Sequence, residues 1–226
     1  MNSKKWFGRL PALSGAIFAV AGFVRGGGDD SAPTASSTGR QIASYAYHHG
    51  IPNALYNVEL GTFLALMVFS VVLYSRLRPA EPKIAVAARI VVAACVVSVA
   101  IKLGSFPAVY ALYSSPVQLD PSVARPLWVI GEFSFTVSML VQALSLGAVA
   151  VSGLLFGGIP RWLAATAGVI ALALAVGFTI GGNFQVAPTL AWTLWLLVAS
   201  VTLFVRAPRA VSGEQPAPTT LSASPA

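Results

Sequence analysis

Six long stretches of mostly apolar residues divide this chain and limit its possible folds more than any other feature. A helix rises about 1.5 Å per residue, so about 20 residues cross the roughly 30 Å hydrocarbon core of a bilayer. The stretches that meet this length cover residues 10–24, 54–75, 84–113, 126–155, 162–181 and 187–205. The sequence therefore predicts an all-α fold, a polytopic membrane bundle of six transmembrane helices (residues 10–205).

The composition agrees with a membrane protein. Hydrophobic residues make up 56% of the chain and charged residues only 9%, and the mean hydropathy is +0.77. Soluble domains are about a quarter charged. The net charge of +7 could suit nucleic acid, but the basic residues stand at the ends of apolar runs. We therefore expect the lipid bilayer, and no nucleic acid, as the surroundings and partner of this chain.

The cysteines and histidines predict no metal and no cofactor. Cys95 is the single cysteine, which excludes an intrachain disulfide and a thiolate metal site. His48 and His49 are adjacent in the chain, so they do not suit a bis-histidine haem pair that spans two helices. Adjacent helical residues point about 100° apart, so these two side chains are also poorly placed to share one ion.

The first apolar stretch has two interpretations. Its basic approach and the small residues Ala19, Val20 and Ala21 are features of a cleavable signal peptide. We favour a retained span, because Trp6 and Phe7 can extend it and no mature soluble domain follows.

The distribution of Lys and Arg predicts the orientation. With residues 1–9 in the cytoplasm, 10 of the 14 basic residues fall on the cytoplasmic side. The positive-inside rule then places both termini in the cytoplasm. The tail, residues 206–226, is rich in Pro, Ser, Thr and Ala, and we expect it to be disordered. The ten basic residues are Lys4, Lys5, Arg9, Arg76, Arg78, Lys83, Arg89, Arg161, Arg206 and Arg209.

The loop between the first two spans, residues 25–53, contains a predicted short helix. After the flexible stretch "GGGDDSAPTASS", Thr38 and Gln41 form a capping box that opens a helix through about His49. Ile42, Tyr45 and His49 share one side of it, which suits a helix lying at the outer membrane surface. Farther along the chain, Pro107 and Pro126 are expected to end or kink the third and fourth spans.

Three ionisable residues stand inside or close to the apolar stretches. Glu59, Lys102 and Glu132 are predicted at a similar depth, a few ångströms below the outer surface. A charge at the bilayer centre costs about 2.5–3.5 kcal/mol, and pairing Lys102 with a carboxylate removes most of that cost. Polar residues share a face of the third span and of the fourth, which suits close helix contact. These residues are Cys95, Ser98, Lys102 and Ser105 on one helix and Ser134, Ser138, Gln142 and Ser145 on the other.

Two hypotheses follow for this cluster. It lines a polar pocket that opens to the outside, with Tyr45, His48, His49 and Asn183 near the mouth, or it is an ion-pair lock that only fixes helix packing. The glycine pairs at 157–158 and 181–182 are predicted to form turns. They do not predict phosphate sites, because no strand precedes either pair and the nucleotide-binding fingerprint requires one.

Three stretches together carry a family resemblance: "GRQIASYAYHHGIPNALYNVELGTFLALMVFSVVLYSRLR" (39–78), "LDPSVARPLWVIGEFSFTVSML" (119–140) and "GGIPRWLAATAGVIALALAVG" (157–177). In this order they resemble a group of uncharacterised six-span integral membrane proteins of high-GC Gram-positive bacteria. The L-D-P-x-V-A-R turn is the most specific match, and Pro126 directly after it departs from the group's pattern. The resemblance implies a helical bundle in the bacterial plasma membrane. It implies no activity, so no catalytic residue can be carried over.

Two classes of function remain. The first is a protein that binds or transports a small polar or amphipathic molecule through the outer pocket. The second is a scaffold or accessory subunit with a membrane-protein partner and no site of its own. An enzyme is third, because the chain lacks a G-x-S-x-G elbow and an H-E-x-x-H zinc pair. We favour the first class; no oligomeric state is predicted.

Overall fold

The computed structural model describes residues 9–25, 32–50, 53–77 and 86–206. Within these ranges the chain is helical and has no strand, which confirms the all-α prediction. Residues 1–8 and 207–226, which include most of the predicted cytoplasmic ends, lie outside them. The elements are η1 (Leu10–Leu13), α2 (Ser14–Arg25), α3 (Gly39–His48), α4 (Asn53–Leu77), α5 (Val86–Tyr113), α6 (Pro121–Phe156), α7 (Arg161–Ile180), η3 (Gly182–Gln185) and α8 (Val186–Val205).

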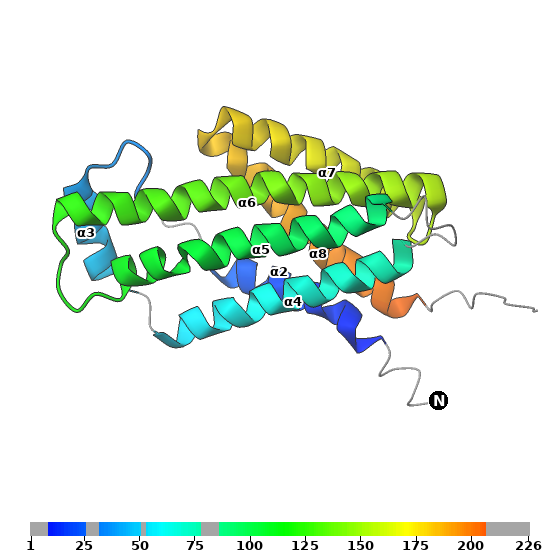
Figure 1. Cartoon of the computed structure of the whole chain (residues 1–226), viewed down its shortest axis with the longest axis horizontal. Coiled ribbons are helices and arrows are strands. Elements are labelled where there is room, and N and C mark those ends of the chain that lie inside the picture. The colour runs from blue at the N-terminus through cyan, green and yellow to red at the C-terminus, as the bar shows by residue number, and fades with distance from the viewer. Residues whose placement is uncertain (1–8, 26–31, 51–52, 78–85, 207–226) are drawn as a thin grey trace, which may run out of the picture.

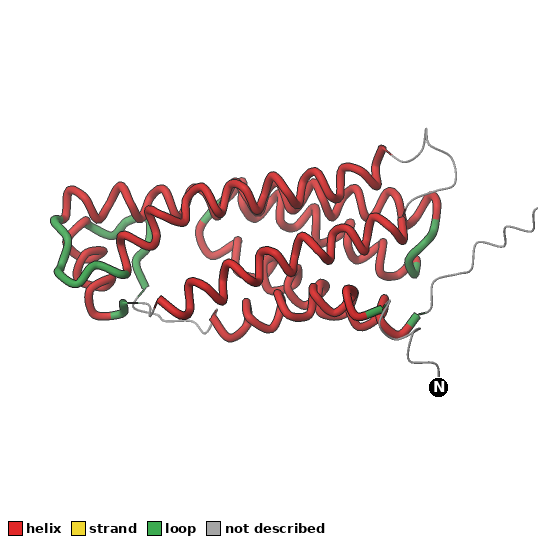
Figure 2. Tube along the Cα trace, turned by 60° about the horizontal axis from the view of Figure 1, so that its bottom comes forward, coloured by secondary structure: helices red, strands yellow, loops and turns green. Residues whose placement is uncertain are grey.

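Five helices are long and apolar enough to cross a membrane. They are α4 from Val58 onward, α5, α6, α7 and α8, and they correspond to the last five predicted spans. The first predicted span is a shorter apolar helix, Leu10–Phe23. Figures 1 and 2 show the long helices running side by side and back and forth, with α3 at one end. We call this the α3 end; η1 and the last residue of α8 lie at the opposite end.

Helix α5 lies between α4 and α6, and hydrogen bonds fix its position. Ser98 Oγ donates to the Ser138 carbonyl at 3.1 Å, and Ser145 Oγ donates to the Val91 carbonyl at 3.2 Å. Interhelical hydrogen bonds of this kind are worth about 0.6 kcal/mol in a membrane protein. These two bonds set the antiparallel register of α5 on α6.

Helix α4 is set against α5 by a weaker contact. The Cys95 thiol lies 3.8 Å from the carbonyl oxygen of Leu66. Both residues are buried in the main core of the bundle. The contact defines which residues of α4 and α5 stand level with each other.

Helix α2 is packed between α4 and α8. A Cβ atom on Gly15 would lie 2.8 Å from the ring of Phe69, so the two helices approach closely at this glycine. Phe18 contacts Trp192 edge to face, with ring centres 5.4 Å apart. Ala19 is fully buried. The shorter first helix is therefore part of the bundle core.

Helix α6 extends beyond its neighbour α7 at the α3 end (Figure 1). The two helices touch through small residues: a Cβ atom on Gly153 would lie 2.7 Å from Ala164 Cβ, and one on Gly168 would lie 3.2 Å from Ala150 Cβ. Continued along both helices, this register brings the end of α7 at Ile180 level with about residue 137 of α6. Residues 121–136 of α6 therefore project past α7, by roughly 24 Å at 1.5 Å per residue.

The start of α6 differs from the prediction. The fourth span was predicted at residues 126–155, with Pro126 expected to end or kink it, but the helix begins at Pro121 and continues through Pro126. Asp120 caps the helix by accepting a hydrogen bond from the Ser122 backbone N–H, and proline is tolerated at the first helical position. Helix α5 likewise continues through Pro107.

Two glycine pairs form the turns at the ends of α7. Gly157 and Gly158 have φ of 79° and 89°, and Gly181 has φ of 82°, conformations that L side chains rarely adopt. At Gly158 a Cβ atom would also overlap the backbone carbonyl of Arg76. The predicted turn role of these glycines is confirmed.

Candidate functional site

The three ionisable residues singled out in the sequence stand at one level of the bundle, and we call them the charged layer (Glu59, Lys102 and Glu132). The hydrogen bonds between α5 and α6 set a register that places Lys102 level with Ser134, within one turn of Glu132. The Cys95–Leu66 contact likewise sets the register of α4 against α5, and this register places Glu59 level with Lys102. The layer lies close to the level at which α7 ends.

Lys102 is held across the α5–α6 interface. Its Nζ atom lies 4.5 Å from the ring centre of Phe135 on α6. The Phe135 ring in turn contacts Phe178 of α7 edge to face, with ring centres 5.6 Å apart. A cation over an aromatic face gains about 2 kcal/mol when it is shielded from water. Glu132, one turn before Phe135, interacts electrostatically with Lys102, so the lysine has an aromatic and an acidic neighbour on α6.

The two carboxylates differ in their surroundings. The side chain of Glu59 is half-buried on α4, and its own backbone carbonyl accepts a hydrogen bond from Thr62 Oγ1 at 2.7 Å. The side chain of Glu132 is exposed on the surface of α6. Lys102 is half-buried, as Glu59 is. The charged layer therefore runs from the partly covered face of α4 to the open surface of α6.

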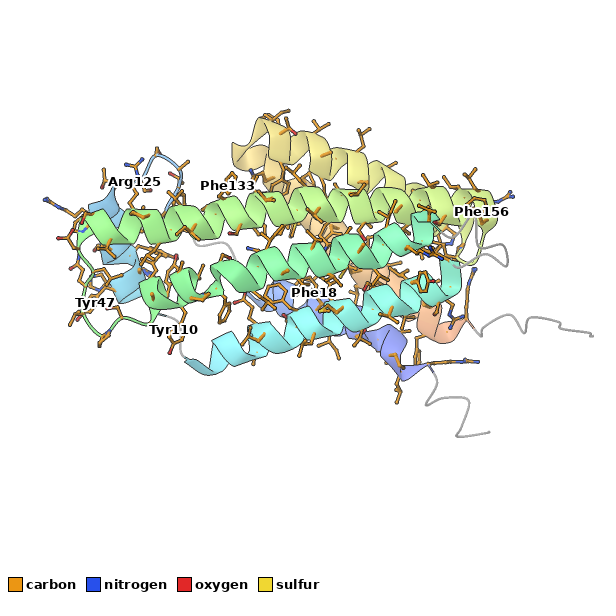
Figure 3. All side chains as sticks on the ribbon, viewed as in Figure 1. Phe18, Tyr47, Tyr110, Arg125, Phe133 and Phe156 are labelled. Atoms are coloured by element: carbon orange, nitrogen blue, oxygen red, sulfur yellow. The ribbon has the colours of Figure 1, made fainter. Side chains whose placement is uncertain are left out.

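Helix α3 and the projecting ends of α5 and α6 form a second, smaller core, which we call the head. The sequence predicted the short helix with its capping box, and both are present: Thr38 Oγ1 accepts from the Gln41 N–H at 3.3 Å. The apolar side of the helix is covered by protein, because α5 and α6 are long enough to reach it. Figure 3 shows Tyr47, Tyr110 and Arg125 around this part of the molecule. The buried residues of the head are Ile42, Ala43, Ala46, Leu112 and Ala124.

Glycines at both ends of α3 allow this helix to lie against the hairpin formed by α5 and α6. A Cβ atom on Gly39 would lie 2.9 Å from the carbonyl carbon of Pro121, the first residue of α6. A Cβ atom on Gly50 would lie 3.1 Å from the Tyr113 carbonyl oxygen at the end of α5. A side chain at Gly39 would force the backbone to shift, and one at Gly50 would require an adjustment of a few tenths of an ångström. The two glycines therefore fix the distance between α3 and the hairpin.

The residues predicted at the pocket mouth make contacts with different partners. The His49 ring stacks on Tyr45 with centres 4.2 Å apart, and its Nδ1 atom lies 3.0 Å from the Tyr45 carbonyl oxygen. His48 instead contacts Tyr47 edge to face at 5.4 Å. Asn183 lies in η3, and its side chain is outside the described part of the chain. The two histidines are thus turned to separate aromatic partners on α3.

Asp120 caps α6 in the turn that leads into the head. Its Oδ1 atom accepts hydrogen bonds from the Ser122 hydroxyl at 2.5 Å and from the Ser122 N–H at 2.8 Å. Hydrogen bonds to the ionised form favour it, so they hold the pKa of this carboxyl below its ordinary value. The cap is thus strongest when Asp120 is ionised.

A cavity between the helices lies deeper in the bundle than the charged layer. Its volume is about 20 Å³, and α4, α5, α6 and α8 contribute its walls. Its polar groups come from the two polar faces recognised in the sequence, with Ser70 added by α4. The cavity itself could not be predicted from the sequence, because its walls depend on how Trp192 and Trp195 of α8 pack.

The described part of the chain is all-helical, and its five long apolar helices are compatible with an integral membrane protein. Comparison of the chain with family models, with curated proteins and with solved structures gives no match.

Proposed function

We propose that this chain is a bacterial inner-membrane protein that binds, at its charged layer, a small amphipathic molecule with a cationic group. The observation that carries the proposal is the common level of Glu59, Lys102 and Glu132 at the end of the bundle where α3 lies. Two carboxylates and one ammonium leave a surplus negative charge there. A cationic group is the ligand that such a surplus favours.

The surroundings of the charged layer support the amphipathic character of the ligand. The ring of Phe135 lies beside the Lys102 ammonium. Phe133, which directly follows Glu132 on α6, has 69% of its surface exposed (Figure 3). An apolar body could contact the exposed Phe133 ring while the cationic group meets Glu132. Aromatic side chains with a few well-placed polar groups are typical of small-molecule sites.

The proposed topology has six spans with both termini in the cytoplasm, so the charged layer faces outward. Helix α2 is included as a retained span because it packs between α4 and α8 with Ala19 buried. Helix α7 has 20 residues, about 30 Å, which matches the hydrocarbon core. Under this topology the charged layer lies near the outer boundary of the core, where a charge costs less than at the centre.

A scaffold for a neighbouring membrane protein is the second candidate, and the head supports it. The projecting hairpin and α3 have their own buried core, with Ile42 at 1% exposure, and so present an ordered surface past the end of α7. A scaffold would use this surface and would need the charged layer only for packing. The resemblance to the six-span bacterial group fits both candidates.

The test compares two probes of matched shape and opposite charge, the tetraphenylphosphonium cation and the tetraphenylborate anion. The purified protein should bind the cation, measured by equilibrium dialysis, and the Glu132→Gln and Glu59→Gln variants should bind it at least several-fold more weakly. Glu214→Gln, the same change in the tail, is the control and should bind as wild type does. Equal binding of both probes, or of all variants, would contradict the proposal. Uptake of the cation into liposomes then distinguishes a carrier from a binding protein.

A further inference from the structure

The cavity inside the bundle contains a polar group that is deeply buried and lacks a protein partner. Gln142 of α6 lines the cavity and is 4% exposed. Within the described part of the chain, its Nε2 atom has no hydrogen-bond partner. An amide N–H buried without a partner costs about 1–3 kcal/mol. The structure therefore places a donor in the middle of the bundle that needs an acceptor.

The same cavity has hydroxyl groups with unused accepting capacity. Ser70 Oγ donates to the Met67 carbonyl at 2.7 Å, and Ser145 Oγ donates to the Val91 carbonyl at 3.2 Å. Each hydroxyl has one proton and two lone pairs, so both oxygens can still accept a hydrogen bond. The Cys95 thiol also lines the cavity.

The size of the cavity limits what it can hold. Its volume is about 20 Å³, and a space of roughly 10–15 Å³ or more accommodates one water molecule when two to four polar partners are present. The rest of the wall consists of apolar side chains and two indole rings, which leave no room for a larger solute.

We propose that this cavity is a binding site for a single water molecule, which accepts a hydrogen bond from Gln142 Nε2 and donates to the hydroxyl oxygens of Ser70 and Ser145. Water can accept and donate at once, so it serves both kinds of group. It connects α4 through Ser70 with α6 through Gln142 and Ser145, and it lies beside Cys95 of α5. The site is thus a polar junction between three helices, and it is separate from the charged layer.

The proposal explains why an otherwise costly amide is placed in an apolar core. Without the water, Gln142 would be better replaced by an apolar residue of similar size, because unsatisfied polar groups in hydrocarbon are expensive. With the water, the amide joins helices that contact each other mainly through small and apolar side chains. The water therefore contributes to the specific packing of α4 against α6.

The test is a crystal structure of the full chain at a resolution that shows ordered water, determined with and without xenon pressure. Xenon enters dry apolar cavities, whereas water already bound to polar groups resists displacement. The wild-type protein should have one water peak within hydrogen-bond distance of Gln142 Nε2 and no xenon in the cavity. Gln142→Met, which keeps the length of the side chain and removes the amide, should lose the water and admit xenon.

Xenon in the wild-type cavity, or neither water nor xenon there, would overturn the proposal. The wild-type crystals decide the question even where the Gln142→Met variant fails to fold. Ser98→Ala is the matched control, because Ser98 is buried in the same α5–α6 interface but does not line the cavity. That variant should keep the water peak.

Discussion

The Lys102 Nζ atom lies 4.5 Å from the ring centre of Phe135, across the interface between α5 and α6. The ring is itself held by Phe178 of α7, so three helices determine where the positive charge stands. Glu132 approaches the same charge from the exposed side of α6. The lysine is therefore fixed by aromatic packing as well as by an acidic neighbour, and this arrangement positions the charge at the end of the bundle where α3 lies.

The proposed orientation can be tested by labelling intact cells. Cysteines introduced at Ser36 and Ser115 should react with a membrane-impermeant thiol reagent, because both positions lie on the predicted outer side. A cysteine at Ser212 should stay unlabelled until the cells are opened. The native Cys95 is 2% exposed and adds little background. The opposite pattern of labelling would reverse the orientation and move the charged layer to the cytoplasmic side.

The cap of α6 should make the stability of the head depend on pH. The hydrogen bonds from Ser122 lower the pKa of Asp120 below its unfolded value, which is about 3.9. A group with a lowered folded pKa stabilises the protein above its unfolded pKa, and this contribution is lost as the pH falls through the folded pKa.

Substitution of the cap residue checks this pH dependence. Asp120→Ala should lower the melting temperature of the purified protein at pH 7, and the difference from wild type should shrink below about pH 4. Asp120→Asn should cost less, because asparagine also caps helices. A difference from wild type that stays constant across this range would show that the charge of Asp120 does not support the cap.

The close approach of α3 to α6 predicts contrasting effects for two glycine substitutions. Gly39→Ala would place a Cβ atom 2.9 Å from the Pro121 carbonyl carbon, and overpacking of this kind costs about 1–3 kcal/mol. Gly61→Ala on α4 meets nothing within 4 Å, so it should be neutral or stabilise the helix by about 0.5–1 kcal/mol. Hydrogen exchange of the amides in residues 39–48 should accelerate in the first variant only. Equal exchange in both would mean that α3 does not depend on this contact.

Much of the fold could be predicted from the sequence because each span is a long stretch of mostly apolar residues. The predicted stretches 162–181 and 187–205 differ by one residue or less at each end from α7 (Arg161–Ile180) and α8 (Val186–Val205). Helix α6 begins at Pro121, before the predicted span 126–155, because Asp120 caps it and proline is tolerated in the first helical turn. The capping box of Thr38 and Gln41 predicted the short helix α3. That α5 and α6 cover its apolar side could not be predicted, because this depends on how far the hairpin of α5 and α6 projects.

The candidate site was only partly accessible from the sequence. Helical spacing identified the polar faces of the third and fourth spans, and hydrogen bonds such as Ser98 to Ser138 join them in the structure. The aromatic contact of Lys102 could not be predicted, because it depends on the register between α5 and α6. The same is true of the cavity beside Gln142, which four helices enclose.

The central claim, that the residues of the charged layer act on one another, is tested most directly by a double-mutant cycle between Lys102 and Glu132. The free energy of unfolding in detergent is measured for wild type, Lys102→Met, Glu132→Gln and the double variant. A second cycle, which combines Arg40→Ala in the head with Glu132→Gln, is the control. Interacting residues give coupling energies of about 0.5–3 kcal/mol, and Lys102 with Glu132 should fall in this range. If the effects of Lys102→Met and Glu132→Gln add within about 0.3 kcal/mol, as those of the Arg40 cycle should, the result would contradict the claim that the residues of the charged layer interact.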